Sequence, residues 1–259
     1  MCRNIDTVIL AVILFVLTNC SPKNQVKLVT MKALEETKVI GEQEALALEN
    51  PEKLIKLSLL GGAKQSTYDR LGEFKNLQYL SLSTCELDEI PKAVFQLKHL
   101  QWLDIESNKI SALPERLFDL KNLRKLNIGD NPFQALPSGI GQLSKLEYIG
   151  LANSKVQSYP KEFAKLQKLR EVMLQSANVT TLPEEFGQLG SLERIYLNFN
   201  PQLDAHQALK VLSKLPKLEE VIMYASGVNT FPPEVVNLKA LKKLYLGGQQ
   251  LNLKQIVPL

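Results

Sequence analysis

A period of 23 residues constrains this chain more than any other feature of its sequence. Units start at Leu54 and recur at that spacing through Leu192, the next starts at Leu218 after a unit of 26 residues, and the last starts at Leu241. Each unit follows the pattern LxxLxLxxNxLxxLPxxIxxLxx. A period of this length indicates supersecondary units that stack on one another and share a core.

The spacing within each unit indicates one short strand. In the third unit, Leu103 and Ile105 alternate with polar residues, which suits a strand with one buried face. Successive strands are expected to pair as a parallel sheet, and the LPxxIxxL half of each unit returns along the opposite side. The asparagine at the ninth position, as at Asn108, is expected to bond backbone groups of neighbouring turns. Cys85 occupies the same position in its unit and is interpreted as another residue of this ladder.

This pattern resembles the leucine-rich-repeat proteins of bacteria, of the LPxxIxxL kind, over residues 54–251. The resemblance implies an α/β fold, a solenoid curved like a horseshoe. Its parallel sheet would line the concave face, and its convex side would be mostly irregular or built of short helices. We therefore assign residues 54–259 to a leucine-rich-repeat domain.

The first twenty residues are typical of an export signal. Arg3 precedes an apolar run, Val8 to Leu17, that is too short to span a bilayer as a helix. Leu17-Thr18-Asn19-Cys20 resembles a bacterial lipobox, which implies cleavage before Cys20 and lipidation of that cysteine; the looser lipoboxes of spirochaetes accept a residue such as Asn19. We interpret residues 1–19 as a lipoprotein signal peptide. The alternatives are a plain signal peptide and an uncleaved membrane tail.

Residues 20–53 are interpreted as a tether and an N-terminal cap, because a solenoid has to cover the core of its first repeat. Ala45, Leu46 and Leu48 are expected on a short helix of this cap. In the unit of 26 residues, a convex helix is expected to begin after its cap at Asp204. The other end has no separate cap, and the apolar residues expected to fold over it are Leu251, Leu253 and Ile256.

Residues between the core leucines are expected on the concave surface of the sheet. Trp102, the only tryptophan, occupies the third position, where adjoining units carry Tyr79, Lys125 and Tyr148. Parallel strands lie about 4.8 Å apart, so Lys125 is expected between two aromatic faces. The fifth position becomes apolar in the C-terminal half, and the seventh and eighth add further rings. This second group consists of Met173, Tyr196, Phe199, Ile222, Tyr224 and Tyr245.

Both groups of rings are interpreted as protein-binding residues. Aromatic neighbours across strands could serve only to stabilise the sheet, at up to about 1 kcal/mol for each pair. The second group, however, would expose apolar surface on the order of a few hundred Å², a size at which patches on monomers begin to mark binding sites. Tyrosine and tryptophan also often dominate interface energetics.

The sequence contains no arrangement typical of an enzyme or of a metal site. Its two histidines, His99 and His206, lie far apart in repeat register, and no phosphate-binding glycine motif is present. Asp104, Glu106 and Asp130 are expected close together and are interpreted as solvated carboxylates. The net charge is +4, with acidic and basic residues interspersed, so no nucleic acid is expected as a partner. No cofactor is expected either.

The sequence therefore predicts an exported protein of the bacterial cell envelope, anchored by a lipid on Cys20 at the outer membrane, that binds a protein through its concave face. The family resemblance includes host surface or matrix proteins among such partners. Two alternatives stay open. One is a structural envelope protein whose last strand pairs with a second copy. The other is an adhesin in which the aromatic line stacks on the rings of a glycan.

Overall fold

The computed structural model describes residues 28–228 and 232–246. The chain divides into two units, residues 1–36 and 37–259, by its internal contacts. In the described part of the first unit, helix α2 (Met31–Glu36) begins with a hydrogen bond from the Ala33 N–H to Thr30 Oγ1. The predicted signal peptide and Cys20 lie outside the described residues. The repeats belong to the second unit.

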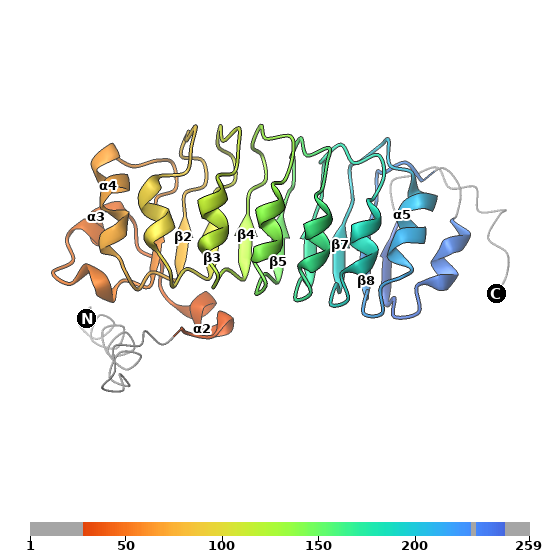
Figure 1. Cartoon of the computed structure of the whole chain (residues 1–259), viewed down its shortest axis with the longest axis horizontal. Coiled ribbons are helices and arrows are strands. Elements are labelled where there is room, and N and C mark those ends of the chain that lie inside the picture. The colour runs from red at the N-terminus through yellow and green to blue at the C-terminus, as the bar shows by residue number, and fades with distance from the viewer. Residues whose placement is uncertain (1–27, 229–231, 247–259) are drawn as a thin grey trace, which may run out of the picture. The chain divides into compact units, whose positions relative to one another are not determined.

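Nine parallel strands form one sheet in the described part of the second unit (Figure 1). Neighbouring strands pair at equivalent repeat positions, so Tyr79 lies beside Trp102 and Trp102 beside Lys125. The middle residue of each strand, such as Leu103, points into the core, and this confirms the predicted sheet. The strands are β1 (Lys56–Ser58), β2 (Tyr79–Ser81), β3 (Trp102–Asp104), β4 (Lys125–Asn127), β5 (Tyr148–Gly150), β6 (Glu171–Met173), β7 (Arg194–Tyr196), β8 (Glu220–Ile222) and β9 (Lys243–Tyr245).

Short helices cover the other side of the sheet, which confirms the predicted solenoid. A proline starts most of them, because its missing N–H is not needed in a first turn. The turn then closes by a bond three residues on, as from Leu117 N–H to the Pro114 carbonyl at 3.0 Å. The helices are η1 (Pro51–Lys53), α4 (Gln65–Arg70), η2 (Leu71–Glu73), η3 (Lys92–Gln96), η4 (Glu115–Asp119), η5 (Ser138–Gln142), η6 (Lys161–Lys165), η7 (Glu184–Gln188), α5 (Ala205–Leu212) and η8 (Pro233–Asn237).

Leucine and phenylalanine side chains fill the space between sheet and helices. Leu100, Leu103 and Leu120 of the third repeat are all buried, and each fully buried leucine contributes about 1.5–3 kcal/mol. Towards the convex side, the rings of Phe163 and Phe186 lie 5.0 Å apart in neighbouring repeats. The core therefore continues from one repeat to the next.

A ladder of buried polar side chains joins the turns that follow the strands. Asn108 Nδ2 donates to the carbonyls of Leu82 and Ile105, and its Oδ1 accepts from the Cys85 and Leu87 N–H groups. Cys85 donates its thiol to a backbone carbonyl one repeat earlier, so its interpretation as a ladder residue is confirmed. The ladder supplies partners to backbone groups that would otherwise be buried and unpaired.

The two expected helices at irregular places in the repeat both form. Asp204 caps α5 by accepting a hydrogen bond from the Gln207 N–H at 2.9 Å, as predicted. At the N-terminal end, α3 (Glu42–Leu46) buries Ala45. The helix contains Ala45 and Leu46, as predicted, but it ends before Leu48, so the prediction that Leu48 belongs to it is wrong. Leu46 and Leu48 are both exposed. The residues expected to cover the other end, Leu251, Leu253 and Ile256, lie outside the described residues.

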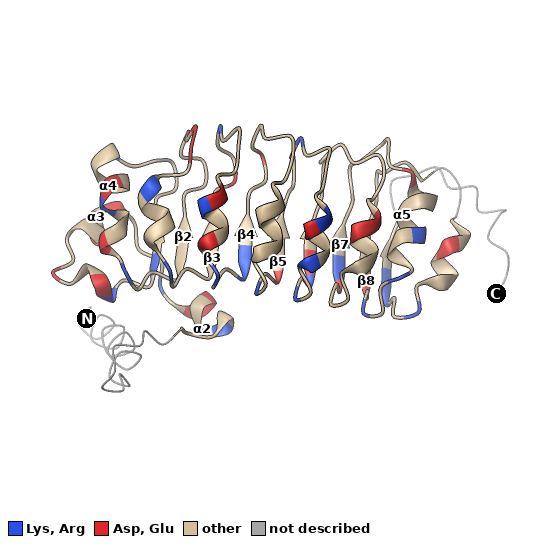
Figure 2. Ribbon diagram, viewed as in Figure 1, with Lys and Arg blue, Asp and Glu red and all other residues tan. Residues whose placement is uncertain are grey.

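Each repeat has one turn that leads out of its strand and one that leads into the next strand. The first kind carries the ladder. The second kind contains blue residues in most repeats in Figure 2, at the lower edge of the sheet. The two edges of the sheet therefore differ in chemistry.

Candidate functional site

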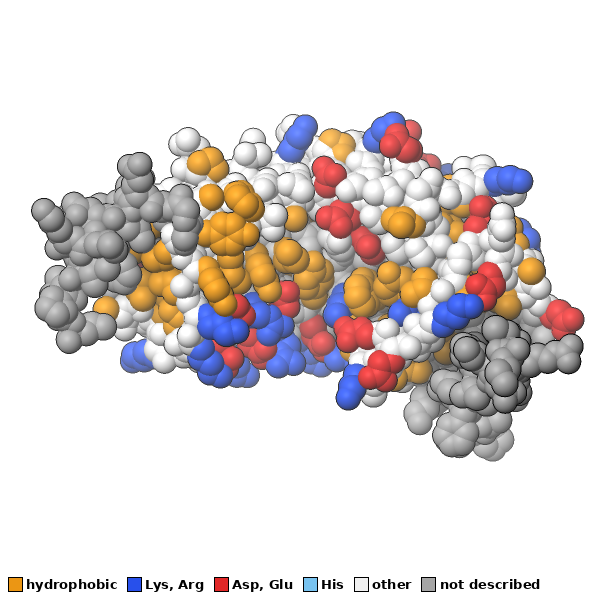
Figure 3. All heavy atoms as spheres, turned by 180° about the vertical axis from the view of Figure 1, so that it is seen from behind, with side chains coloured by type: hydrophobic (Ala, Val, Ile, Leu, Met, Phe, Trp, Pro, Cys, Tyr) orange, Lys and Arg blue, Asp and Glu red, His pale blue; other side chains and the backbone are white. Residues whose placement is uncertain are grey.

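The strand face, which we define as the side of the sheet that carries the third and fifth repeat positions, presents the predicted binding residues. The register places Tyr79, Trp102, Lys125 and Tyr148 side by side on β2 to β5, as predicted. Met173 and Tyr196 are partners on β6 and β7 in the same way. Figure 3 views the unit from this side and shows hydrophobic side chains gathered toward β7 to β9, above a band of charged ones.

The aromatic line, defined as Tyr79, Trp102 and Tyr148 together with Lys125, is packed along the sheet. Lys125 Nζ lies 4.3 Å from the centroid of the Trp102 ring. On the other side of Trp102, Tyr79 meets it edge to face at 5.0 Å, and Lys56 Nζ lies 4.8 Å from the Tyr79 ring. All three rings are half-buried. Much of the surface of these rings is therefore covered by contacts within the chain, and the exposed remainder is held in a fixed orientation.

Tyr148 occupies the middle of the strand face and donates its hydroxyl to Met173 Sδ at 3.0 Å. Burial raises the pKa of Tyr148, and the nearby carboxylates of Glu171 and Glu106 raise it further. Burial also raises the pKa of Asp104, although the Glu106 N–H donates to its carboxylate at 3.2 Å. Tyr148 is consequently a neutral hydrogen-bonding group at physiological pH.

A hollow of about 450 Å³ opens on the strand face around these residues. Trp102 and Lys125 lie at one end, Tyr148 in the middle and Arg194 at the other end. Its remaining walls are polar or charged. The hollow can therefore accept a polar group of a partner between aromatic surfaces.

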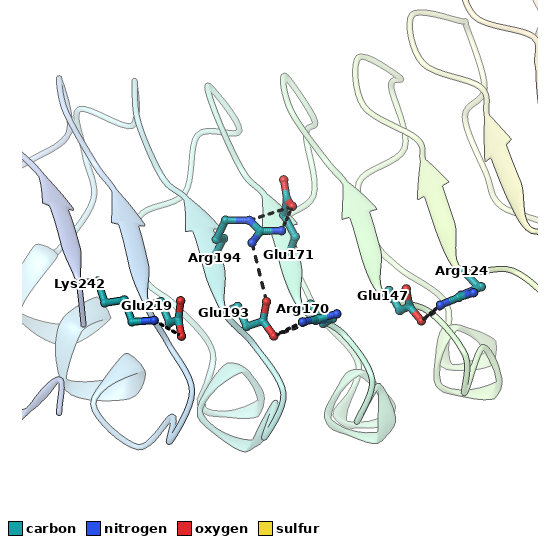
Figure 4. Close-up of polar contacts among 8 residues, drawn as sticks. All are labelled: Arg124, Glu147, Arg170, Glu171, Glu193, Arg194, Glu219 and Lys242. Carbon is teal, nitrogen blue, oxygen red and sulfur yellow. Dashed lines mark hydrogen bonds and ion pairs between the residues drawn. The ribbon is translucent and has the colours of Figure 1, made fainter. Parts of the chain in front are cut away.

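The sequence interpretation missed the ion pairs that bound this hollow. Arg124 pairs with Glu147, Arg170 with Glu193, and Arg194 with Glu171, always between neighbouring strands (Figure 4). The second repeat position, where the first two of these pairs lie, alternates basic and acidic residues from Arg124 to Glu193. Reading down that position would have predicted the pairs. They leave this part of the strand face close to electroneutral.

Two residues at the second repeat position are buried, although the sequence interpretation expected them on the surface. Gln78 and Gln101 are buried, and Gln101 Nε2 donates to Gln78 Oε1 at 2.8 Å. The two side chains hydrogen-bond to each other, so burial does not leave these two polar atoms without a partner. The outward orientation predicted for these two glutamines is wrong.

The C-terminal patch, defined as Met173, Tyr196, Phe199, Ile222, Tyr224 and Tyr245, holds the most exposed rings. Phe199 is 45% exposed and Tyr245 44%. The Phe199 ring meets Tyr224 edge to face, with the centroids 5.1 Å apart. Exposed apolar side chains of this size are unfavourable in water, and their burial against a partner would be favourable.

Phe199 also has an unusual backbone. It lies at the eighth repeat position, where the non-glycine residues adopt a left-handed conformation, with φ between 49° and 59°. The other residues there are small or polar, whereas Phe199 is bulky, and such a residue pays about 1–3 kcal/mol for this conformation. Its neighbour Asn198 is buried, and the side-chain Nδ2 has no hydrogen-bond partner among the described residues. The residues with left-handed backbone at this position are Thr84, Ser107, Asp130, Asn153, Ser176, Phe199 and Ala225.

Ile222 does not contribute to the exposed part of the C-terminal patch. It is only 6% exposed, and its register partners on either side are Tyr196 and Tyr245. A short branched side chain between two larger tyrosines leaves little surface for solvent. The expectation of an exposed Ile222 is therefore wrong.

Two further carboxylates that the sequence placed close together bond to neutral side chains. Glu106 accepts from Asn127 and Asp130 from Ser107, so these carboxylates are bonded to neutral side chains. The described residues include no cluster of three or more His, Cys, Asp or Glu side chains that could hold a metal ion. Within the same residues, no helix combines the length and apolar character needed to cross a membrane.

The repeats and the sheet define a solenoid of the leucine-rich-repeat type. A family model described as "Leucine-rich repeat region" matches residues 53–149 and 138–256, and the chain belongs to this family. Proteins of the family generally mediate protein–protein interactions and are typically binding modules without enzyme activity. A comparison with curated proteins finds no match.

Two solved structures resemble the chain. A leucine-rich-repeat protein of Leptospira interrogans is 29% identical, with a TM-score of 0.61 over 77% of this chain and 56% of that one. An internalin of Listeria monocytogenes is 21% identical, with a TM-score of 0.60 over 94% of this chain and 63% of that one, and it supports the fold alone. The chain thus spans less than two thirds of the length of either structure.

Proposed function

We propose that this protein is a binding module for a partner protein and that the C-terminal patch makes the principal contact. The exposed, left-handed Phe199 carries the proposal. Its conformation costs free energy, its ring lies against Tyr224, and the buried side-chain Nδ2 of the neighbouring Asn198 has no hydrogen-bond partner within the described part of the chain. Costs of this kind tend to collect at functional sites, where a partner offsets them.

The aromatic line serves as a second contact region in this proposal. Lys56 holds the Tyr79 ring, Lys125 holds the Trp102 ring, and Tyr148 is held by its hydrogen bond to Met173. These rings would therefore lose little side-chain entropy on binding. The hollow beside Trp102 and Tyr148 accepts a polar group, whereas the C-terminal patch accepts apolar ones. A partner that spans both regions needs a corresponding polar and apolar surface, which is typical of proteins.

The proposed setting is the bacterial cell envelope, with the chain exported and tethered through a lipid on Cys20. The support is the sequence of residues 1–20, with its apolar run and its resemblance to a lipobox. A lipid anchor would hold the protein at the outer membrane while the repeats remain in water. The proposed partner is then another envelope protein or, in a bacterium that lives with a host, a host surface or matrix protein.

The first experiment is site-specific photocrosslinking in the producing cells. A photoreactive residue replaces Phe199 or Tyr245 in separate variants, and another replaces Val236, which is 64% exposed on the convex helix η8. Val236 is the matched control, because it is an equally accessible apolar side chain away from the strand face. We expect a discrete crosslinked protein from the first two positions and none from the third.

The result also separates the proposed function from its alternatives. Equal crosslinking from all three positions, or none with every partner source tried, would overturn the proposal. Crosslinks from Tyr245 to a second copy of this chain would support pairing of the last strand instead. Loss of the crosslinked product after enzymatic deglycosylation of the target would support glycan recognition.

Protease accessibility on intact cells tests the setting. Digestion of the repeats from outside, with an intracellular control protein protected, is expected for a surface-exposed protein that binds a host partner. Protection until the outer membrane is permeabilised would contradict a host partner and leave an envelope partner. Mass spectrometry of the mature N-terminus tests lipidation, and an unmodified Cys20 would contradict the anchor.

A further inference from the structure

A row of lysines follows one edge of the sheet. In eight of the nine repeats, one of the two residues before the first leucine is a lysine, and all eight are exposed. The repeat therefore places in one line lysines that lie far apart in the sequence (Figure 2). We call this row the lysine edge, and its members are Lys53, Lys75, Lys98, Lys121, Lys145, Lys168, Lys217 and Lys239.

None of these eight lysines forms an ion pair with a described residue. Lys121 and Lys145 bond only to the neutral side chains of Gln142 and Asn122. Within two residues of the row, only Glu52 and Asp119 are acids without an ion pair among the described residues. The other three acids there form ion pairs with other residues: Glu73 with Arg70, Glu147 with Arg124, and Glu219 with Lys242.

The arginines near the same edge behave differently. Arg124 and Arg170 pair with glutamates of the next strand, and the neutral band that they form lies directly beside the lysine edge. The spacing between strands is about 4.8 Å, so neighbouring lysines lie well within a Debye length of about 10 Å and their potentials add. The fold thus keeps a line of lysines without ion pairs among the described residues, on the order of 40 Å long and interrupted only at the repeat that starts at Leu192.

We propose that the lysine edge docks on an anionic lipid bilayer. A rigid, nearly one-dimensional row of charges can bring all its members to a plane at once. Lysine ammonium groups recognise charge density, and they lack the planar fork with which arginine recognises individual phosphate or sulfate groups. Mobile lipid headgroups present such an averaged charge, whereas a polysaccharide presents fixed groups.

The lipid anchor proposed at Cys20 is consistent with this occupant. A single lipid or apolar segment combined with a basic surface gives stable membrane attachment, because the two contributions add. Docking by the edge leaves the strand face accessible, since the lysines lie at the ends of the strands and the rings on their broad side. The inference is independent of the protein partner proposed for the strand face.

Vesicle binding of the full chain tests the inference. One set of vesicles contains equal parts of phosphatidylcholine and phosphatidylglycerol, and the other contains phosphatidylcholine alone, which measures attachment through the N-terminal segment. Each lysine near an anionic surface contributes about fivefold in affinity, so we expect at least tenfold tighter binding to the anionic vesicles, lost at high salt.

Two variants with the same change in net charge provide the decisive comparison. The edge variant replaces Lys75, Lys98, Lys168 and Lys217 by Gln. The control variant replaces four exposed lysines elsewhere, Lys92, Lys155, Lys161 and Lys210, by Gln. We expect the edge variant to lose the preference for anionic vesicles and the control variant to keep it, with circular dichroism and melting unchanged in both.

Three outcomes would overturn the inference. One is equal affinity of the unaltered chain for both kinds of vesicle. Another is an equal loss in the two variants, which would show a dependence on net charge alone. The third is edge-dependent binding to soluble heparin without any preference for anionic vesicles, which would make an anionic polysaccharide the ligand of the lysine edge.

Discussion

The ring of Phe199 meets the ring of Tyr224 edge to face, with their planes at 84°. Tyr224 is half-buried, while Phe199, on a left-handed backbone, is 45% exposed. The pair therefore consists of a supporting ring and a displayed ring. Backbone strain at an exposed, bulky residue is consistent with the proposed contact to a partner, because such strain tends to collect at functional sites.

Replacement of Phe199 by Asn should separate binding from stability. Asparagine adopts the left-handed conformation readily, as at Asn153, so relief of about 1–3 kcal/mol of strain offsets the loss of an aromatic pair of about 0.5–1.5 kcal/mol. We expect the free energy of unfolding to change by less than about 1 kcal/mol, measured by urea denaturation. Crosslinking or affinity for the partner should fall at least tenfold, the loss typical of a residue that anchors an interface.

Asn153→Ala is the control for this variant, because Asn153 has the same repeat position and backbone conformation outside the C-terminal patch. It should leave partner binding unchanged. A large loss of stability in Phe199→Asn, with binding retained by the folded fraction, would show that Phe199 stabilises the sheet and does not bind.

The ladder offers a direct comparison of a satisfied and an unsatisfied position. Asn108 is buried and pairs with backbone groups of two turns, its own and that of the preceding repeat, so Asn108→Ala should cost about 3 kcal/mol or more of unfolding free energy. Ser154 has the equivalent position two repeats later, and its buried hydroxyl has no hydrogen-bond partner among the described residues. Ser154→Ala should therefore be neutral or stabilising by about 1 kcal/mol.

Urea denaturation of both ladder variants at the same pH measures the difference. A destabilised Ser154→Ala would mean that its hydroxyl is satisfied in solution, for example by a bound water molecule. An Asn108→Ala variant of unaltered stability would show that the backbone groups of those turns find other partners, and the ladder would then have no role in holding the repeats together.

Most of the fold could be predicted because a single pattern governs both its core and its register. Once Leu103 and Ile105 are assigned to the core, Trp102 and Asp104 must face away from it, and the same assignment applies to every repeat. The pattern does not specify how far a helix extends at an irregular end, which is why Leu48 was wrongly assigned to the helix of the cap.

The site was predicted less completely, because exposure depends on neighbours in other repeats. Ile222 lies on the predicted face but is covered, since the residues beside it on β7 and β9 are tyrosines. The ion pairs and the lysine edge follow from reading one position across all repeats, a comparison that the sequence interpretation made only for aromatic residues. The backbone strain at Phe199 has no signal in composition and needs the dihedral angle.

The contact of Lys125 with Trp102 can be measured in isolation, because the chain has only one tryptophan. Lys125→Met keeps the length of the side chain and removes its charge. We expect a loss of about 0.5–1 kcal/mol of unfolding free energy and a change in tryptophan fluorescence intensity or emission maximum. Lys155→Met, at an exposed position on another edge, should change neither. Identical fluorescence of Lys125→Met and the unaltered chain would contradict the cation–π contact.

The partly buried carboxylate of Asp104 should make stability depend on pH. Burial raises the pKa of Asp104 above the value of an exposed aspartate, so the folded state binds this proton more tightly than the unfolded state does. The contribution of the group is therefore most favourable in acid, and it falls as the pH rises from the ordinary aspartate pKa through the raised pKa of the folded state. At neutral pH the penalty is complete.

Asp104→Asn removes the charge and keeps an oxygen that can accept from the Glu106 N–H. We expect its melting temperature to exceed that of the unaltered chain by up to a few degrees at neutral pH, with the difference fading below the ordinary aspartate pKa. Thermal melts across that range, with the exposed Asp88→Asn as control, measure the effect. A variant that is less stable by the same amount at every pH would show that the hydrogen bonds of the carboxylate outweigh its desolvation, and the strand face would then be stabilised, not strained, by the charge at its centre.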